Sequence, residues 1–175
     1  MAILKIARMG HPVLMKKAEP VADPTAPEIV QLVRDMIDTL EDIGGRVLAA
    51  PQVHVGKRLV IIHAEQVTAT PDVLINPVIE PLGEEMALGW EGCLSVPGLR
   101  GVVPRWRRIR YTGIDLDGHK VEREAEDMHA RVVQHECDHL DGVLYTQRMP
   151  DLRYLIFETE TKHHLGQIVL PEDVD

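Results

Sequence analysis

Residues 134–140 read Gln134-His135-Glu136-Cys137-Asp138-His139-Leu140, and within them lies the pattern H-E-x-x-H. Histidines four positions apart in an α-helix are separated by about 40° around its axis, so both imidazoles project from one face. Two neutral imidazoles there can bind a divalent cation, and the glutamate after the first histidine can act as a base toward water. The stretch therefore predicts a metal-binding helix in a hydrolytic enzyme, whose third protein ligand must come from elsewhere in the chain.

The whole chain has 175 residues, enough for one domain with a hydrophobic core and too few for two of ordinary size. We expect a single domain over residues 1–175, with residues from about 150 to 175 forming a helix or a tail. The net charge of −9 argues against a broad basic surface for nucleic acids. The locally basic segment 105–110 alternates like a strand, which favours a solvated strand face over contact with an anion. Without a secretory signal or a membrane-length apolar run, we expect a cytoplasmic protein with no membrane contact.

Two helices are indicated by apolar spacing and by the residues at their ends. Thr25 is expected to be the N-cap of the first helix, with Glu28 completing a capping box, and Gly44-Gly45 should end it. Asp127 is expected to cap the helix that carries the histidines, and Gly142 should end that helix. The apolar stripe of the first helix comprises Ile29, Leu32, Val33, Met36, Ile37, Leu40 and Ile43.

Strand patterns fill the region between these helices. Residues 58–64 and 73–79 predict buried strands, and residues 102–116 are rich in β-forming side chains. Asp117-Gly118 is a strong hairpin signal before a returning strand at 119–125. Because the strands come in a block without βαβ alternation, we expect an α+β fold with mostly antiparallel sheets packed around a central metal-binding helix.

Two residues compete to be the third metal ligand. Glu158 lies downstream at a spacing that resembles thermolysin-like metalloproteases, in which a later helix supplies a glutamate. Cys93 lies upstream beside Gly92, which allows close backbone approach. Cys137 is excluded because it points about 200° around the helix from His135. The residues alone leave open a protease that uses Glu158, a hydrolase that uses Cys93, and a non-catalytic protein with a structural metal.

Three separated stretches resemble the peptide deformylase family. Residues 45–52, Gly45-Arg46-Val47-Leu48-Ala49-Ala50-Pro51-Gln52, are similar to its first motif, G-x-G-x-A-A-x-Q. Residues 91–95, Glu91-Gly92-Cys93-Leu94-Ser95, are identical to its second motif, E-G-C-L-S, and residues 134–140 match its third, Q-H-E-x-D-H-L. The resemblance covers nearly the whole chain up to about Met149, and it selects Cys93 over Glu158 as the third ligand.

The resemblance implies a metal-dependent amidase that removes the formyl group from the N-terminal formyl-methionine of new polypeptides. Cys93, His135 and His139 would bind the metal. Glu136 would transfer protons, and the Gln52 side chain with the backbone N–H of Leu94 would stabilise the oxyanion. The metal is expected to be Fe²⁺, although one thiolate and two imidazoles also suit Zn²⁺, Ni²⁺ or Co²⁺.

The implied substrates are N-formyl-methionyl nascent peptides, and a transient ribosome contact suits an enzyme that acts on them. The acidic tail at 170–175 is ill suited to ribosomal RNA. Arg100 is expected to pair with Glu91 or to orient the site. The candidate substrate-binding residues, which would offer backbone groups to an added peptide strand or an apolar pocket for methionine, are Gly45, Glu91, Gly92, Met128 and Val132.

One residue departs from the family pattern. Val47 stands where the first motif has its second glycine. Valine disfavours positive φ and brings a branched side chain to the wall of the cleft. A deformylase-like hydrolase with an altered substrate range is therefore an alternative.

Overall fold

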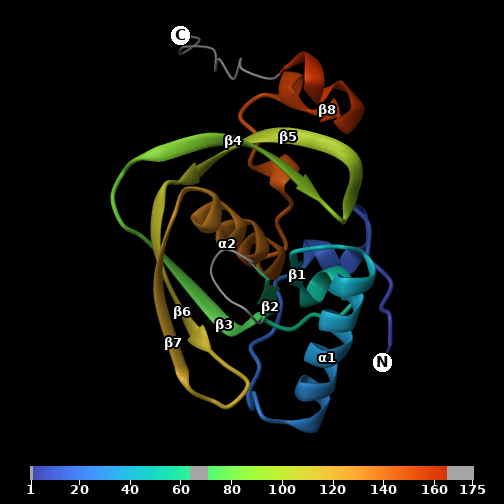
Figure 1. The fold of residues 1–175 in the computed structure, drawn as a ribbon, viewed down its shortest axis with the longest axis vertical. Helices are drawn as coiled ribbons and strands as arrows, with labels where there is room; N and C mark the ends of the chain where they lie inside the picture. The colour runs from blue at the N-terminus through green and yellow to red at the C-terminus, as the bar shows by residue number, and fades with distance from the viewer. Residues whose placement is uncertain (1, 64–70, 165–175) are drawn as a thin grey trace.

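The helix that carries the H-E-x-x-H pattern lies at the centre of the molecule. The computed structural model describes residues 2–63 and 71–164. Helix α2 (Asp127–Leu140) is buried from Ala130 onward apart from the partly exposed Val132. It contacts strands of two separate sheets, and Figure 1 shows it between them. The predicted α+β fold, with antiparallel sheets around a central helix, is confirmed.

The strands in the described part of the chain form two antiparallel sheets. The larger sheet has the order β1-β2-β3-β6-β7, and the smaller has the order β4-β5-β8. The strands are β1 (Val47–Ala49), β2 (Leu59–Ile62), β3 (Asp72–Pro81), β4 (Met86–Cys93), β5 (Val96–Trp106), β6 (Arg108–Ile114), β7 (Lys120–Glu126) and β8 (Ile156–Phe157).

The predicted strands correspond to β2, β3 and β7, although the predicted end of the first, Ala64, lies outside the described residues. The predicted stretch 102–116 is divided between β5 and β6, which are separated at Arg107. The hairpin signal is confirmed, since Gly118 has φ +82° between β6 and β7. Strands β1, β4 and β8 were not predicted.

Strand β2 explains how the layers stack, because its four residues are all buried. Leu59 and Ile61 pack in one core cluster with helix α1 (Pro27–Asp42). Val60 and Ile62 pack in a second cluster with α2. Side chains alternate across a strand, so α1 and α2 must cover opposite faces of the larger sheet. The smaller sheet then covers the other side of α2 (Figure 1).

The helix ends differ in part from the predictions. The N-cap of α1 is Ala26 and not Thr25, because Asp23 Oδ1 accepts both the backbone N–H and the hydroxyl of Thr25, at 2.8 and 2.7 Å. The N-cap of α2 is Glu126, because the Asp127 carboxylate pairs with Arg107. Both predicted helix stops are confirmed, with Gly44 and Gly142 at φ +62° and +74°.

Short 3₁₀ turns complete the described chain. After α2 the chain makes two such turns, adds β8 to the edge of β5, and ends in a third turn that leads to His164. Residues 165–175, which include the predicted acidic tail, lie outside the described residues. The 3₁₀ turns are η1 (Pro12–Met15), η2 (Ala50–Val53), η3 (Tyr145–Gln147), η4 (Leu152–Tyr154) and η5 (Glu158–His163).

None of the helices in residues 2–63 and 71–164 combines the length and apolar character needed to span a bilayer.

Candidate metal centre and active site

The side chains of Cys93, His135 and His139 converge between α2 and the smaller sheet. One ligand atom from each lies within 4.8 Å of the others. Cys93 ends β4, and its Sγ lies 3.3 Å from His139 Nε2. The two imidazoles come from one face of α2, and their centroids are 5.2 Å apart. The cysteine that is distant in sequence thus lies beside the histidines, as the resemblance predicts.

These residues fit a divalent transition metal. Burial lowers the pKa of His139 to about 3, so its imidazole is neutral, which is the form that binds a metal. Among the described residues, the buried Nδ1 of His139 and Oε2 of Glu136 have no hydrogen-bond partner. The cluster offers three side chains that could hold a metal ion, one with a soft sulfur and two with imidazole nitrogens. Catalytic centres commonly have three protein ligands, which leaves a position for water or substrate.

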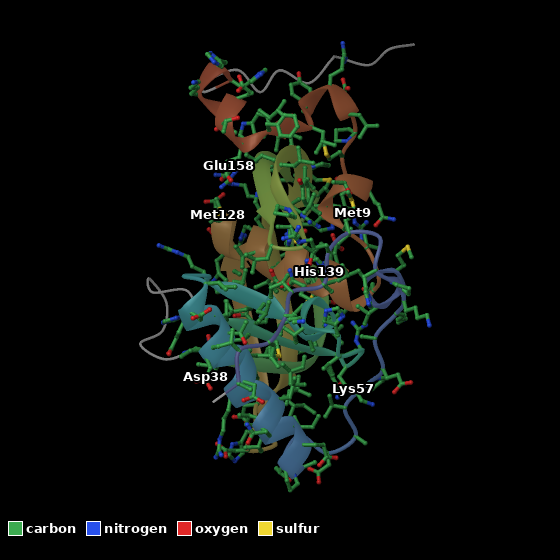
Figure 2. The ribbon with its side chains drawn as sticks, turned by 90° about the vertical axis from the view of Figure 1, so that its right-hand side faces the viewer. Met9, Asp38, Lys57, Met128, His139 and Glu158 are labelled. Carbon is green, nitrogen blue, oxygen red and sulfur yellow. The ribbon has the colours of Figure 1, made fainter. Side chains whose placement is uncertain are left out.

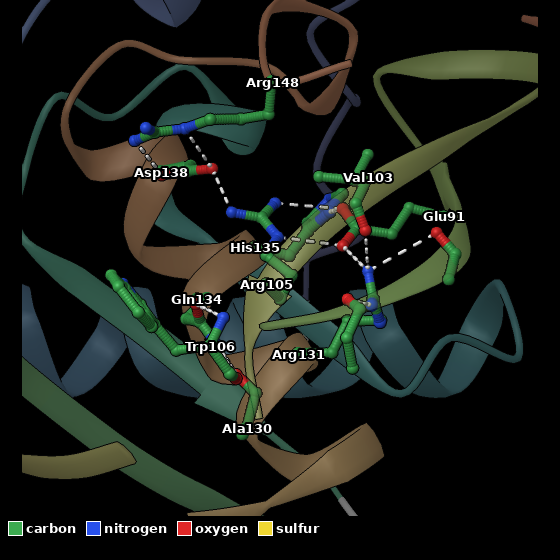
Figure 3. Close-up of polar contacts among 12 residues, drawn as sticks. Glu91, Val103, Arg105, Trp106, Ala130, Arg131, Gln134, His135, Asp138 and Arg148 are labelled. Carbon is green, nitrogen blue, oxygen red and sulfur yellow. Dashed lines mark hydrogen bonds and ion pairs between the residues drawn. The ribbon is translucent and has the colours of Figure 1, made fainter. Parts of the chain in front are cut away.

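The carboxylate of Glu91 contacts the Nδ1 side of the His135 ring. Its Oε2 lies 2.8 Å from His135 Nδ1, which leaves Nε2 of that ring for a ligand. Arg105 and Arg131 both donate to Oε1, at 2.9 and 2.8 Å (Figure 3). Burial opposes ionisation of Glu91, but the hydrogen bonds from His135 and Arg105 lower its pKa to about 2. Glu91 is therefore a carboxylate that orients His135.

Arg105 connects the second and third motifs through buried ion pairs. It is 4% exposed, and its Nη1 donates to Asp138 Oδ2 at 2.6 Å while two other nitrogens bind Glu91. Asp138 also pairs with Arg148 at 2.8 Å (Figure 3). The predicted solvated strand face is wrong at Arg105, because its side chain faces α2 and two buried carboxylates. The sequence did contain a signal for this role, because Glu91 and Asp138 are acidic residues of the second and third motifs, and buried acids need a cationic partner.

Two further residues around α2 were missed by the sequence analysis. Arg131 is buried and donates to the carbonyls of Ala87 and Val103 as well as to Glu91. Gln134 binds both backbone groups of Trp106, at 3.0 and 2.9 Å. Together these side chains attach α2 to β4 and β5. Arg131 lies one helical turn before His135, which is the spacing that could have revealed it.

Glu136 is buried in the same region of α2. Burial raises the pKa of its carboxyl to about 7. A group with such a pKa can both accept and donate a proton near neutral pH, as a general acid–base residue must.

Gln52 lies in η2, and Leu94 directly follows Cys93 in the chain. The Gln52 Oε1 accepts the backbone N–H of Ala49 at 2.9 Å, so its Nε2 faces Cys93 Sγ at 3.5 Å and Ser95 Oγ at 3.4 Å. Leu94 lies in the two-residue turn between β4 and β5. Both residues line the same cavity as Glu136. Two potential oxyanion donors are thereby brought to one cavity.

This cavity has a volume of about 620 Å³ and extends from the metal centre to solvent. Val47 contributes to its wall within β1, opposite Ile62. Val47 is not among the described residues with positive φ, so the valine is accommodated without backbone strain. Figure 2 shows Met128 toward one side of the central region that contains His139. All five predicted substrate-binding residues line the cavity: Gly45, Glu91, Gly92, Met128 and Val132.

Glu158 does not belong to the ligand cluster. Its Oε1 accepts hydrogen bonds from Arg100 Nε and Nη2, at 3.0 and 2.6 Å, at the exposed rim of the cavity. The predicted pairing of Arg100 with Glu91 is therefore wrong. The thermolysin-like alternative is not favoured, because Cys93 and not Glu158 joins the two histidines.

The fold and the site define a metal-dependent hydrolase of the α+β class that is built on an H-E-x-x-H helix. Residues 3–154 match the family model described as polypeptide deformylase. The chain is 48% identical to peptide deformylase 2 of Ralstonia nicotianae, covering 97% of this chain and 96% of that protein. It is 50% identical to peptide deformylase 1 of Bordetella pertussis, covering 95% and 94%. The chain belongs to the polypeptide deformylase family.

Solved structures agree with this assignment. The crystal structure of a peptide deformylase from Thermotoga maritima has a TM-score of 0.80 at 36% identity, covering 86% of this chain and 100% of that one. The Met-Ala-Ser-bound crystal structure of a class I type b peptide deformylase from Acinetobacter baumannii has a TM-score of 0.78 at 35% identity, covering 85% and 99%.

Proposed function

We propose that Cys93, His135 and His139 hold the metal with which this chain removes the formyl group from N-terminal formyl-methionine, releasing formate. Membership of the family makes the chain a metal-dependent hydrolase that acts on an amide bond. The observation that carries the residue assignment is the convergence of one cysteine sulfur and two imidazoles beside the buried Glu136. The three ligands leave room for substrate, which supports a catalytic centre over a structural one.

The chemistry follows from the residues around the centre. When bound, the metal ion supplies a Lewis acid that polarises the formyl oxygen and lowers the pKa of water. Glu136 accepts a proton from the attacking water and later delivers a proton to the departing amine, for which its pKa of about 7 suits it. The Nε2 of Gln52 and the backbone N–H of Leu94 donate hydrogen bonds to the developing oxyanion.

The peptide lies along the cavity as an added strand in this proposal. Strand β4 is an edge strand of the smaller sheet, so its outer backbone groups near Gly92 are available for a peptide. Gly45 faces the same cavity from the other side. The apolar side chains of Met128 and Val132 provide a pocket for the methionine. The related enzyme that was solved with Met-Ala-Ser supports a peptide of this kind.

The metal and the cellular setting complete the proposal. We propose Fe²⁺ as the native ion, with Zn²⁺, Ni²⁺ or Co²⁺ as ions that the same ligands could hold. An enzyme that acts on polypeptides during their synthesis is expected to work near the ribosomes that make them. We therefore propose that the chain acts as one domain in the cytoplasm, in transient contact with ribosomes.

Metal content and formate release from formyl-Met-Ala-Ser test this function. Cys93→Ala is expected to lose the metal and the activity, whereas Cys137→Ala is a matched control because its thiol packs in the core away from the ligands. Glu136→Gln should keep the metal and lose about 10²- to 10⁴-fold in kcat. Full metal content and activity in Cys93→Ala would contradict the ligand set. Elemental analysis after anaerobic purification identifies the native ion.

A further inference from the structure

The segment that follows the family match forms part of the active-site cleft. The match ends at residue 154, and the next residues form β8 and η5. Ile156 and Phe157 pair with Arg100 and Leu99 of β5. Strand pairing fixes the position of this segment relative to the smaller sheet. The segment therefore has a defined place beside the strands that carry the second motif.

The far end of the segment reaches the other strand of the same hairpin. The ring of His164 lies 6.2 Å from that of Trp90 in β4, edge to face. Trp90 lines the cavity, as does Glu158 at the start of η5. Figure 1 shows the segment lying over β5, and Figure 2 shows Glu158 on the same side of the molecule as Met128. The segment thus contributes Glu158 to the lining of the cleft.

Glu158 occupies the edge of the Arg100 guanidinium that could otherwise bind another carboxylate. Its Oε1 accepts from both Nε and Nη2, which is the edge of a guanidinium that binds carboxylates in a fork. Both side chains are partly exposed, at 40% for Arg100 and 54% for Glu158, so a bound peptide can reach them. A carboxylate on that peptide would have to displace Glu158 from this edge. An uncovered Arg100 would instead attract acidic side chains.

The other charges of the cleft do not substitute for Glu158. Glu91, Arg131 and Glu136 are buried and lie deep in the cavity. Among the described residues that line the cavity, Arg46 and Arg100 are the cations with substantial exposure, and Glu158 is the exposed carboxylate. Without Glu158, the described residues that line the cavity would include the exposed Arg46 and Arg100 and no exposed carboxylate.

We propose that Glu158 is a specificity-determining counter-ion, which occupies the carboxylate-binding edge of Arg100 and keeps the cleft from selecting acidic side chains after the methionine. The inference rests on the proposed deformylase function. It fits an enzyme that must accept nascent chains of any sequence, because a bare arginine at the rim would favour some of them. The segment beyond the family match thereby acquires a role in substrate choice.

The test is kcat/KM for three peptides, formyl-Met-Ala-Asp, formyl-Met-Ala-Ser and formyl-Met-Ala-Lys, each with an amidated C-terminus. In Glu158→Gln the ratio for the aspartate peptide over the neutral serine peptide is expected to rise roughly three- to fivefold above wild type, as one unit charge at contact distance in water predicts. The increase should disappear at about 1 M salt. Glu160→Gln is the matched control, since it removes the same charge from the same turn and Glu160 does not line this cavity.

The possible outcomes separate the two proposals. An unchanged ratio in Glu158→Gln, with the serine peptide still cleaved, overturns the role of Glu158 and leaves the deformylase function intact. Equal changes in kcat/KM for all three peptides also overturn it, because they would mean that Glu158 shapes the cleft but does not select peptides by charge. Failure of metal-loaded wild type to cleave any of the three peptides overturns the deformylase function and this inference with it.

Discussion

At the scale of single residues, the centre depends on side chains that do not themselves contact a metal. Glu91 orients His135, and Arg105 neutralises Glu91 and Asp138 at once. The desolvation of these three charged groups is offset only while all of them are paired. Truncation of Arg105 would remove the buried partner that Glu91 and Asp138 share and leave them to Arg131 and Arg148, so stability should respond strongly.

Arg105→Ala should therefore lower the free energy of unfolding by about 3–5 kcal/mol, as expected for breaking a buried ion pair. Arg107→Ala is the matched control two positions away, because Arg107 is exposed and its ion pairs among the described residues are with the exposed Glu85 and Asp127. Urea unfolding of the metal-loaded proteins measures both losses. A loss in Arg107→Ala as large as that in Arg105→Ala would contradict the network.

At the scale of elements, the C-terminal end of α2 is held in place by its packing against the N-terminal segment. Gly142 follows the helix at φ +74°, and a Cβ built there would lie 2.8 Å from the backbone carbon of Met15. The backbone N–H of Ala18 also donates to the carbonyl of Leu140 at 2.8 Å. The N-terminal segment thus packs directly against the end of the helix that carries both histidines.

Gly142→Ala should be more destabilising than Gly118→Ala. Both glycines have positive φ, so each alanine incurs about 1–2 kcal/mol of backbone strain. At Gly118 the nearest atom to the added Cβ is 4.0 Å away, whereas Gly142 faces backbone. Overpacking should add about 1–3 kcal/mol at Gly142. Thermal unfolding of the two variants gives the difference, and equal losses would show that the close approach has no energetic effect.

At the scale of the whole molecule, the three proposed metal ligands lie in separate layers. His135 and His139 belong to α2, whereas Cys93 belongs to the smaller sheet. A metal held by all three would cross-link these layers in the folded state. The unfolded chain has no such preformed site, so metal binding must add to the stability of the fold.

Chelation should lower the melting temperature of wild type by about 8–16 °C, if the free metal had been at a thousand times its Kd. Cys93→Ala should melt at the same temperature with and without chelator, because it lacks the cross-link. Differential scanning calorimetry at fixed protein concentration measures both. An equal decrease in the variant would indicate that the stabilising metal binds elsewhere.

The features that the sequence predicted correctly are mostly local. The two histidines share a helix face because α-helical periodicity is a property of the backbone, and Asp117-Gly118 forms a hairpin because glycine accepts positive φ. The juxtaposition of Cys93 with the histidines required the family resemblance, because spacing alone left Glu158 as an alternative. The predicted N-cap at Thr25 was wrong, because the capping rule did not take into account that the nearby Asp23 accepts the hydrogen bond of the Thr25 hydroxyl.

The sequence by itself determined that His135 and His139 share one face of α2 beside Glu136, that α1 is amphipathic, and the fold class. The tertiary structure alone decided that Arg105 is buried and that Arg100 pairs with Glu158 rather than Glu91. The physical reason is that helix and turn patterns depend on neighbouring residues. The partner of a charged side chain depends instead on which distant segments pack against it and exclude water.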